Sequence, residues 1–134
     1  MKKLTLILLC IATLGLASCK KDTIVQQTPN ITIIRDITPS QFLLSNDQLT
    51  LSANLPIDAI DQFHVDNEAT LVYISYNNGA SYIQMPFVYN IDSYSYEVYD
   101  GGLSIDIQSS DFQDRTPFRP SSNVRIKVVL IASE

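Results

Sequence analysis

The sequence predicts an all-β protein: an antiparallel β-sandwich with Greek-key, immunoglobulin-like connectivity, about seven or eight strands and one short helical turn. Three observations support this fold class. Apolar residues alternate with polar ones along most of the chain after residue 30, which is typical of half-buried strands. Turn-forming residues separate the alternating segments at short intervals. A long polar loop over 108–123, with two prolines, is suited to cross between sheets.

Eight segments carry either this alternation or the β-branched and aromatic residues that strands prefer. In the clearest of them, 48–55, leucine or alanine at every second position alternates with a polar residue. From the N-terminus onward, the predicted strands cover 31–37, 41–44, 48–55, 69–76, 81–88, 94–99, 103–108 and 124–130.

Turn chemistry predicts the connections between these strands. Asn-Asn-Gly at 77–79 predicts a tight hairpin, and Asp-Gly-Gly at 100–102 predicts a second one. Together they make 69–108 an antiparallel meander. Isoleucine and phenylalanine at a spacing of three within 57–63, directly after a strand-ending proline, predict one helical turn that covers the end of the core.

The start of the chain has a basic N-terminus, an apolar stretch and small residues before a cysteine. The sequence Leu16-Ala17-Ser18-Cys19 resembles the lipobox cleaved by the lipoprotein signal peptidase. This resemblance implies that Leu16, Ala17 and Ser18 form the cleavage site and that Cys19 carries the lipid. An ordinary secretory signal with a chance cysteine is the alternative. The apolar stretch is shorter than the roughly 18–20 residues of a membrane-spanning helix.

These features divide the chain into three predicted parts. Residues 1–18 are a signal peptide that is removed, 19–30 are a lipidated flexible tether, and 31–134 are a single β-sandwich domain. More than one acyl chain makes such an anchor stable, so the membrane is an expected partner. Because Cys10 leaves with the signal and Cys19 carries the lipid, the domain has no thiol for a disulfide, a zinc site or a cysteine nucleophile.

Charge argues against one class of partner. The mature chain, 19–134, holds seven Lys and Arg against fourteen Asp and Glu, because Lys2 and Lys3 leave with the signal, so its net charge is −7. Such a domain repels phosphate backbones, and we expect no nucleic-acid partner. A soluble surface beside an anionic membrane accounts for the charge; a cation-binding surface is the alternative.

Residues suited to catalysis or metal binding are few. His64 is the only histidine, and its apolar neighbours favour a packing or edge position over a catalytic one. Nearby acids could form a hard-cation cluster, but no EF-hand spacing is present and solvated loop acids account for them better. The sequence therefore predicts no catalytic residue, no metal site and no cofactor. The acids concerned are Asp58, Asp61, Asp66 and Glu68.

Tyrosine is the most suggestive residue type for binding. All seven tyrosines lie within 73–99. A tyrosine ring supplies a large amphipathic contact area at low entropic cost. We expect most of them to pack in the core. Those expected to be exposed, and to contact a protein or glycan ligand, are Tyr76, Tyr89 and Tyr99.

Three segments occur in an order that points to a family: Val-Asp-Asn-Glu-Ala-Thr-Leu-Val-Tyr at 65–73, Met-Pro-Phe at 85–87 and Arg-Ile-Lys-Val-Val-Leu-Ile at 125–131. This order resembles a group of small, largely uncharacterised lipoproteins of Bacteroidota with a β-sandwich domain. The likeness covers roughly residues 36–132. The chain differs from the group at Glu68, where glycine is usual, and at Tyr82, where tryptophan is usual. The resemblance implies the fold and an outer-membrane location, but no activity.

In the same phylum, charged residues directly after the lipidated cysteine resemble a surface-export signal, and residues 20–22 are charged here. This slightly favours a surface-exposed domain over a periplasm-facing one. Asp-Thr-Ile at 22–24 is similar to the O-glycosylation acceptor of that phylum, which implies a glycan on Thr23.

These features predict an outer-membrane-anchored lipoprotein that acts as a non-catalytic binding or interaction module of the cell envelope. The alternative is a structural accessory subunit of an outer-membrane or surface assembly, which pairs an edge strand with a partner. The apolar final strand, 124–132, is the candidate edge. A small hydrolase ranks third, and buried acids converging on His64 would favour it.

Overall fold

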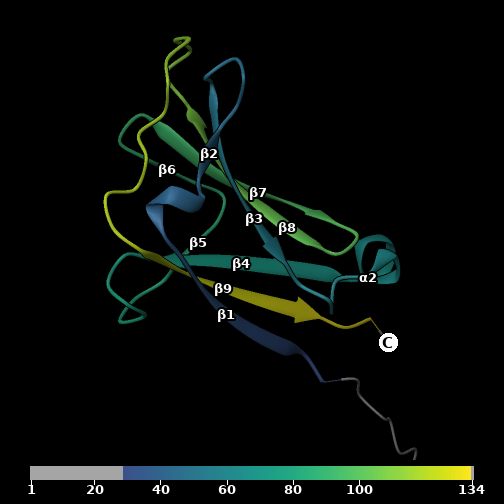
Figure 1. Ribbon diagram of the computed structural model, residues 1–134. Helices are drawn as coiled ribbons and strands as arrows, with labels where there is room; N and C mark the ends of the chain where they lie inside the picture. Colours follow the sequence, from purple (N-terminus) through teal and green to yellow (C-terminus); the bar gives the residue numbers. More distant parts are fainter. Residues whose placement is uncertain (1–28, 134) are drawn as a thin grey trace, which may run out of the picture.

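The computed structural model describes residues 29–133 and shows two antiparallel β-sheets packed against each other (Figure 1). One sheet has four strands in the order β1-β9-β4-β5 and lies across the lower part of the figure. The other has five strands in the order β2-β3-β8-β7-β6 and rises above it. The predicted antiparallel β-sandwich is therefore confirmed. Over 29–133, no helix is long and apolar enough to cross a membrane.

Alternating residues build the four-stranded sheet. In β9 every second side chain is buried, from Val124 to Leu130. The register carries this inner face into β4, where Val72 pairs with Val128. The strands of this sheet are β1 (Ile31–Ile37), β9 (Val124–Ile131), β4 (Ala69–Ser75) and β5 (Ile83–Gln84).

The five-stranded sheet follows the same period of two. Leu103 and Ile107 of β8 are fully buried and pair with inward-facing residues of β3. The predicted turn between β7 and β8 is present, and Gly101 adopts a φ of +98° that favours glycine. A side chain on Gly102 would lie 2.3 Å from the Leu55 carbonyl oxygen. The strands are β2 (Leu43–Leu44), β3 (Thr50–Pro56), β8 (Gly102–Ser109), β7 (Asp92–Tyr99) and β6 (Phe87–Tyr89).

The chain passes between the sheets in a Greek-key pattern. Consecutive strands β3 and β4 lie in different sheets, and so do β8 and β9. Yet β3 pairs with β8, and β4 pairs with β9, so the two crossings interlock. The loop 110–123 makes the crossing from β8 to β9, close to where the sequence predicts it. Inward-facing side chains from both sheets then form one core.

The prediction of one strand over 81–88, and of one meander over 69–108, is wrong. The segment divides into β5, which pairs with β4 in the first sheet, and β6, which pairs with β7 in the second. Between them, Met85 is buried in the core. Pro86 has no N–H to donate to a strand neighbour, so the ladder ends and the chain changes sheet.

The predicted helical turn lies later in the chain than expected. The helix α2 (Gln62–Asn67) begins after Asp61, whose carboxylate accepts a hydrogen bond from the backbone N–H of His64 at 2.8 Å. This N-cap sets the start of the helix. Ile57 and Ile60 are buried at the end of the core, as expected, but Phe63 is 59% exposed.

Two further local predictions differ from the structure. Residues 39–41 form the 3-10 turn η1 (Pro39–Gln41), which leaves only β2 as a strand within 41–44. The connection from β4 to β5 covers 76–82 rather than a tight hairpin. Its backbone N–H groups bond to the side chains of Ser75 and Asn77, so side chains stabilise this longer loop.

The final strand is also not the edge that the sequence predicts. β9 lies between β1 and β4, and both of its sides are paired. The edge strands of the described residues are β1, β5, β2 and β6. Among these, β1 has seven residues, while the others have two or three.

Candidate binding site

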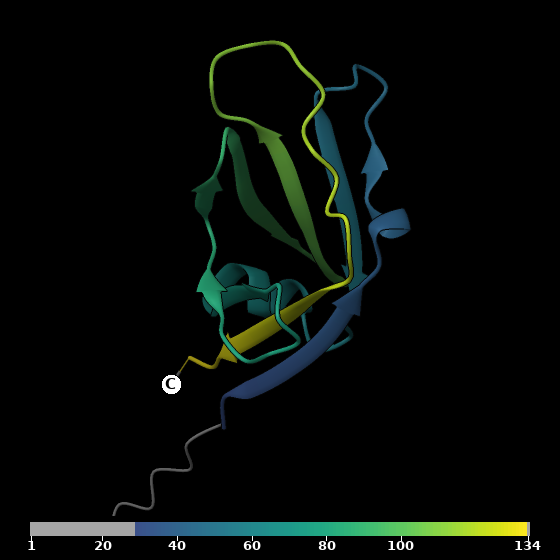
Figure 2. The same ribbon diagram turned by 90° about the vertical axis from the view of Figure 1, so that its left-hand side faces the viewer.

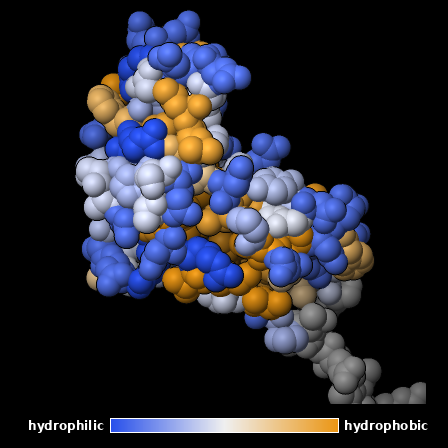
Figure 3. All heavy atoms as spheres, viewed as in Figure 1, coloured by the Kyte–Doolittle hydropathy of each residue, from blue (hydrophilic) through white to orange (hydrophobic). Residues whose placement is uncertain are grey.

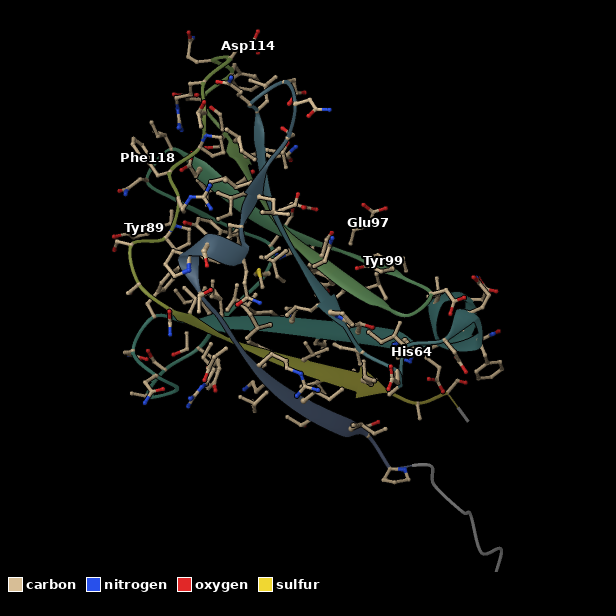
Figure 4. The ribbon with its side chains drawn as sticks, viewed as in Figure 1. His64, Tyr89, Glu97, Tyr99, Asp114 and Phe118 are labelled. Carbon is tan, nitrogen blue, oxygen red and sulfur yellow. The ribbon has the colours of Figure 1, made fainter. Side chains whose placement is uncertain are left out.

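At opposite ends of β4 lie two clusters of polar and aromatic residues. Thr70, near the start of the strand, meets His64 of α2, while Tyr76 directly follows the end of the strand. Figure 4 shows His64 on one side of the molecule and Tyr89 and Phe118 on the other. Each cluster is a candidate site.

His64 is held on both sides of its ring. Nδ1 lies 2.6 Å from Oε2 of Glu68, and Nε2 lies 2.7 Å from Oγ1 of Thr70. The Thr70 carbonyl oxygen in turn accepts a hydrogen bond from the Tyr96 hydroxyl at 2.8 Å. These contacts tie α2 to β4 and β7.

An acid, a histidine and a hydroxyl group linked by hydrogen bonds recur in nucleophilic enzymes. A substrate must be able to reach such a set for it to act. His64 is only 2% exposed, and both of its ring nitrogens already have partners. No reacting group can therefore approach the ring in this conformation. The geometry is that of an interior contact between a helix and a sheet.

Of the four acids near His64 in sequence, only Glu68 contacts its imidazole ring. Asp61 caps α2, and Asp66 accepts a hydrogen bond from the Gln62 amide at 2.8 Å. Within residues 29–133, no group of three or more His, Cys, Asp or Glu is placed to hold a metal ion.

The second cluster surrounds a pocket of about 450 Å³. The pocket lies between the β5–β6 side of the sandwich and the crossing loop 110–123. Figure 2 looks onto this side of the molecule, with β5 and β6 on one flank and the loop on the other. This volume falls within the range of small-ligand sites.

Two strands and two loops supply the aromatic rings of the pocket: Tyr89 lies on β6, Tyr94 on β7, Tyr76 directly after β4 and Phe118 in the crossing loop. The ring centroid of Tyr76 lies 6.4 Å from those of Tyr89 and Tyr94, at interplanar angles of 33° and 90°. Tyr94 is buried and stacks on Phe87 at 4.9 Å, so it forms the floor. Tyr76 is 42% exposed, Tyr89 is 58% exposed and Phe118 is 64% exposed. These three rings form the rim.

The hydroxyl groups of Tyr76 and Tyr94 in the pocket are neutral. Burial, and then the neighbouring hydroxyls of Tyr94 and Tyr89, raise the pKa of Tyr76 above its ordinary value of 10.0. Burial also raises the pKa of Tyr94. Both side chains therefore keep their protons at physiological pH and can donate as well as accept hydrogen bonds.

Two arginines hold the crossing loop in place. The Asp92 carboxylate, 3% exposed, accepts hydrogen bonds from Arg115 Nη2 at 2.6 Å and from the backbone N–H of Phe118 at 2.9 Å. Arg119 donates to the backbone carbonyl oxygens of Pro39, in η1, and of Phe42, directly after it. Because these intramolecular bonds fix the loop, the pocket is preorganised, which lowers the entropic cost of binding.

The structure brings together two of the three tyrosines predicted to contact a ligand. Tyr76 and Tyr89 share the pocket rim. Tyr99 is exposed as well, but it lies at the far end of β7, where its hydroxyl donates to the Leu103 carbonyl oxygen at 3.3 Å. Ligand contact at each of the three stays a prediction.

The sequence analysis missed Phe118 and the pair of Asp92 and Arg115. A signal for Phe118 was present, because prolines at 117 and 120 restrict the loop on both sides of an aromatic residue. Asp92 opens the inward-facing series of β7, and a buried carboxylate needs a cationic partner. The sequence pattern does not identify Arg115 as the partner of this carboxylate, since Arg115 is 23 residues away.

The predicted sites near the N-terminus lie outside the described residues. They are the cleavage site at Leu16, Ala17 and Ser18, the lipidation site at Cys19 and the glycosylation site at Thr23.

No protein-family model, curated protein or solved structure matches this chain. The resemblance to the Bacteroidota lipoproteins therefore rests on the motifs alone. Fold and site together define a β-sandwich domain with a preorganised, tyrosine-lined pocket at one end.

Proposed function

We propose that the protein is a lipid-anchored lipoprotein of the outer membrane, that its domain is a non-catalytic binding module, and that a glycan binds in the tyrosine pocket. The lipobox-like sequence ending at Cys19 supports the anchor. The charged residues 20–22 favour an orientation toward the cell surface over one toward the periplasm. The observation that carries the binding proposal is the preformed pocket with the exposed rings of Tyr76 and Tyr89 at its rim.

The chemistry of the pocket suits a sugar ring, which has an apolar C–H face and a rim of hydroxyl groups. The rings of Tyr76, Tyr89 and Phe118 offer exposed apolar area for the first. Asn90 and Ser121, which also line the pocket, offer hydrogen-bonding groups for the second. This combination of apolar walls and a few polar groups is typical of small-ligand sites.

The lining of the pocket also supports binding without hydrolysis. Glycoside hydrolysis usually needs two carboxyl groups that flank the scissile bond. Asp92 is the only acid among the residues that line the pocket, and Arg115 and the Phe118 N–H already occupy its carboxylate. A ligand would therefore meet no free pair of acids there.

The test is a calorimetric screen of the purified protein against neutral and uronic-acid-containing oligosaccharides. For the oligosaccharide that binds, we expect Tyr89→Ala to weaken affinity about tenfold, which corresponds to roughly 1.4 kcal/mol of lost aromatic contact. Tyr99→Ala is the matched control, because it removes an exposed tyrosine far from the pocket. Equal loss in both variants, or no binding to any oligosaccharide, would contradict the proposal.

A structural accessory subunit is the second candidate function. The observation that favours it is the seven-residue edge strand β1, which has no strand on its outer side among residues 29–133. An exposed edge can pair with a strand of another chain. The two functions are compatible, because β1 is not part of the pocket lining.

A further inference from the structure

The outer edge of β1 is the longest stretch of backbone that a second strand could join. The other edge strands in residues 29–133 have only two or three residues. They leave part of the strand behind them unpaired, but the longest such stretch, 95–99 of β7, has five residues against the seven of β1. The pairing of β1 with β9 runs without interruption from Ile31–Leu130 to Ile37–Val124, so no bulge turns the edge away. The strand contains neither proline nor lysine, two residues that natural edges use against pairing.

The side chains of β1 leave apolar surface beside this edge. Ile31 is 47% exposed and Ile34 is 42% exposed. Figure 3 shows apolar side chains at the surface in the lower part of the molecule, where β1 runs. Of the two charged residues on the strand, Asp36 pairs with Arg125 at 2.7 Å, while Arg35 donates to the neutral Ile34 carbonyl oxygen at 3.0 Å and keeps its positive charge. The edge therefore presents β-branched residues, one ion-paired carboxylate and one guanidinium group.

We propose that β1 pairs antiparallel with β1 of a second copy of this chain. The two-fold axis passes midway between the two copies of Ile34. The two four-stranded sheets then join into one continuous sheet. Ile34 is the middle residue of the strand, so this register pairs all seven residues.

The sequence of β1 is self-complementary in this register. Ile34 faces its own copy, and Ile31 faces Ile37. The remaining pairs join Thr32 to Asp36, and Ile33 to Arg35. An apolar pair therefore meets at the centre, where Ile34 is exposed, and no like charges are opposed. At both ends Ile31 lies beside Ile37, whose side chain is already buried in its own core, so these two pairs contribute mainly through the backbone. A shift of the axis by one residue to Arg35 would place two guanidinium groups opposite each other and shorten the pairing.

The predicted tether allows two copies to share one membrane. In the dimer the two strands begin about 20 Å apart, the length of six residue steps at roughly 3.4 Å each. A tether over 19–30 can span up to about 40 Å at full extension. A lipid anchor would also confine the copies to one surface and raise their effective concentration. This support rests on the proposed anchor, whereas the self-complementarity of β1 does not.

The test is disulfide crosslinking of the full chain in its own membrane. In the proposed register the two Ile34 Cα atoms are directly opposite, which places them about 4.5–5.5 Å apart, a distance that a disulfide can bridge. The two Thr32 Cα atoms lie about 14 Å apart, which it cannot. We expect Ile34→Cys to give a disulfide-linked species of twice the monomer mass, while Thr32→Cys and the wild type, with Cys10 and Cys19, give none.

Three results would overturn the proposal. They are absence of the Ile34→Cys dimer, equal crosslinking of Thr32→Cys, and crosslinking of Ile34→Cys to a protein of different mass. Light scattering of the detergent-extracted wild type provides a measurement without substitution, and it should give two copies per particle. Failure of oligosaccharide binding would leave these results unchanged, because no pocket residue belongs to β1.

Discussion

At one end of β4, Thr70 bonds a histidine that is buried; at the other, the chain leaves the strand through Tyr76 and lines a pocket. The first cluster contains the residue types of a catalytic set, yet both ring nitrogens of the histidine are already occupied by Glu68 and Thr70. The second contains no reactive arrangement, but it leaves aromatic rings and about 450 Å³ open to solvent.

The difference shows that solvent access, more than residue type, decides which of the two clusters can bind a ligand. His64 has an acid and a hydroxyl within hydrogen-bonding distance, and these contacts stabilise the junction of α2 and the sheet. Tyr76 and Tyr89 have no chemistry beyond their rings and hydroxyls. They nevertheless lie where a ligand can contact them, and the hydrogen bonds of Arg115 and Arg119 fix the crossing loop that forms the other wall of the pocket. The following predictions test this contrast.

The largest effect is expected at the buried cluster of His64, Glu68 and Thr70. His64→Ala should lower the free energy of unfolding by about 3 kcal/mol, because it leaves a cavity and removes the partner of Glu68 and Thr70. Phe63→Ala is the matched control in the same helix; its side chain is 59% exposed, so a change within about 0.5 kcal/mol is expected. Urea denaturation measures both. A small loss at His64 would mean that the cluster is not structural.

The second largest effect is expected at the ion pair of Asp92 and Arg115, which anchors the crossing loop beside the pocket. Asp92→Asn should lower the free energy of unfolding by about 2 kcal/mol, because Arg115 loses its buried anionic partner while remaining partly exposed itself. The same variant should weaken oligosaccharide binding, since the crossing loop loses an anchor. Denaturation and calorimetry on one preparation separate the two effects. Unchanged affinity in a destabilised variant would show that the loop is held by other contacts.

At the pocket rim, stability and binding should separate. Phe118→Ala removes a ring that is 64% exposed, so the free energy of unfolding should change by no more than about 0.5 kcal/mol. Oligosaccharide affinity should fall several-fold, because one of the three rim rings is lost. His64→Gln, measured in parallel, should lower stability and leave affinity within twofold. If Phe118→Ala instead lowered stability and His64→Gln weakened binding, the binding site would lie at the His64 end of β4.

The smallest effect concerns pH. Hydrogen bonds from Ser109, the Gln113 backbone and Arg115 hold the pKa of Asp111 below its ordinary value of 3.8. A carboxyl with a depressed pKa stabilises the fold above the pKa of the unfolded chain, and this contribution is lost as the pH falls through the folded value. Wild type should therefore lose slightly more stability between pH 6 and pH 3 than Asp111→Asn. Parallel urea midpoints that shift by equal amounts would contradict this role of Asp111.

Much of the fold was predictable, because a period of two fixes which residues face inward. The strand at 31–37 has the predicted bounds, and those at 48–55, 69–76, 103–108 and 124–130 differ by one or two residues. The change of sheet at Met85 and Pro86 was not predicted. A proline shows where a ladder ends, but the next partner depends on contacts distant in sequence.

The site was predictable only in part for the same reason. Alternation and turn positions placed Tyr76 and Tyr89 at the surface, and they could not show that the two rings meet. Their proximity depends on β5 and β6 lying in different sheets, and on the crossing loop folding back onto Asp92. These are long-range contacts, and local sequence patterns do not encode them. Tyr99 has the same local pattern and lies elsewhere.

The most direct test of the central claim is a map of amide chemical-shift changes by nuclear magnetic resonance, with the best-binding oligosaccharide at saturation. We predict that the largest changes gather around Tyr76, Tyr89 and Phe118, while the amides of α2 and of Thr70 stay unchanged. Changes centred on His64 and α2, or spread over the outer face of either sheet, would contradict the assignment of binding to the open end of β4.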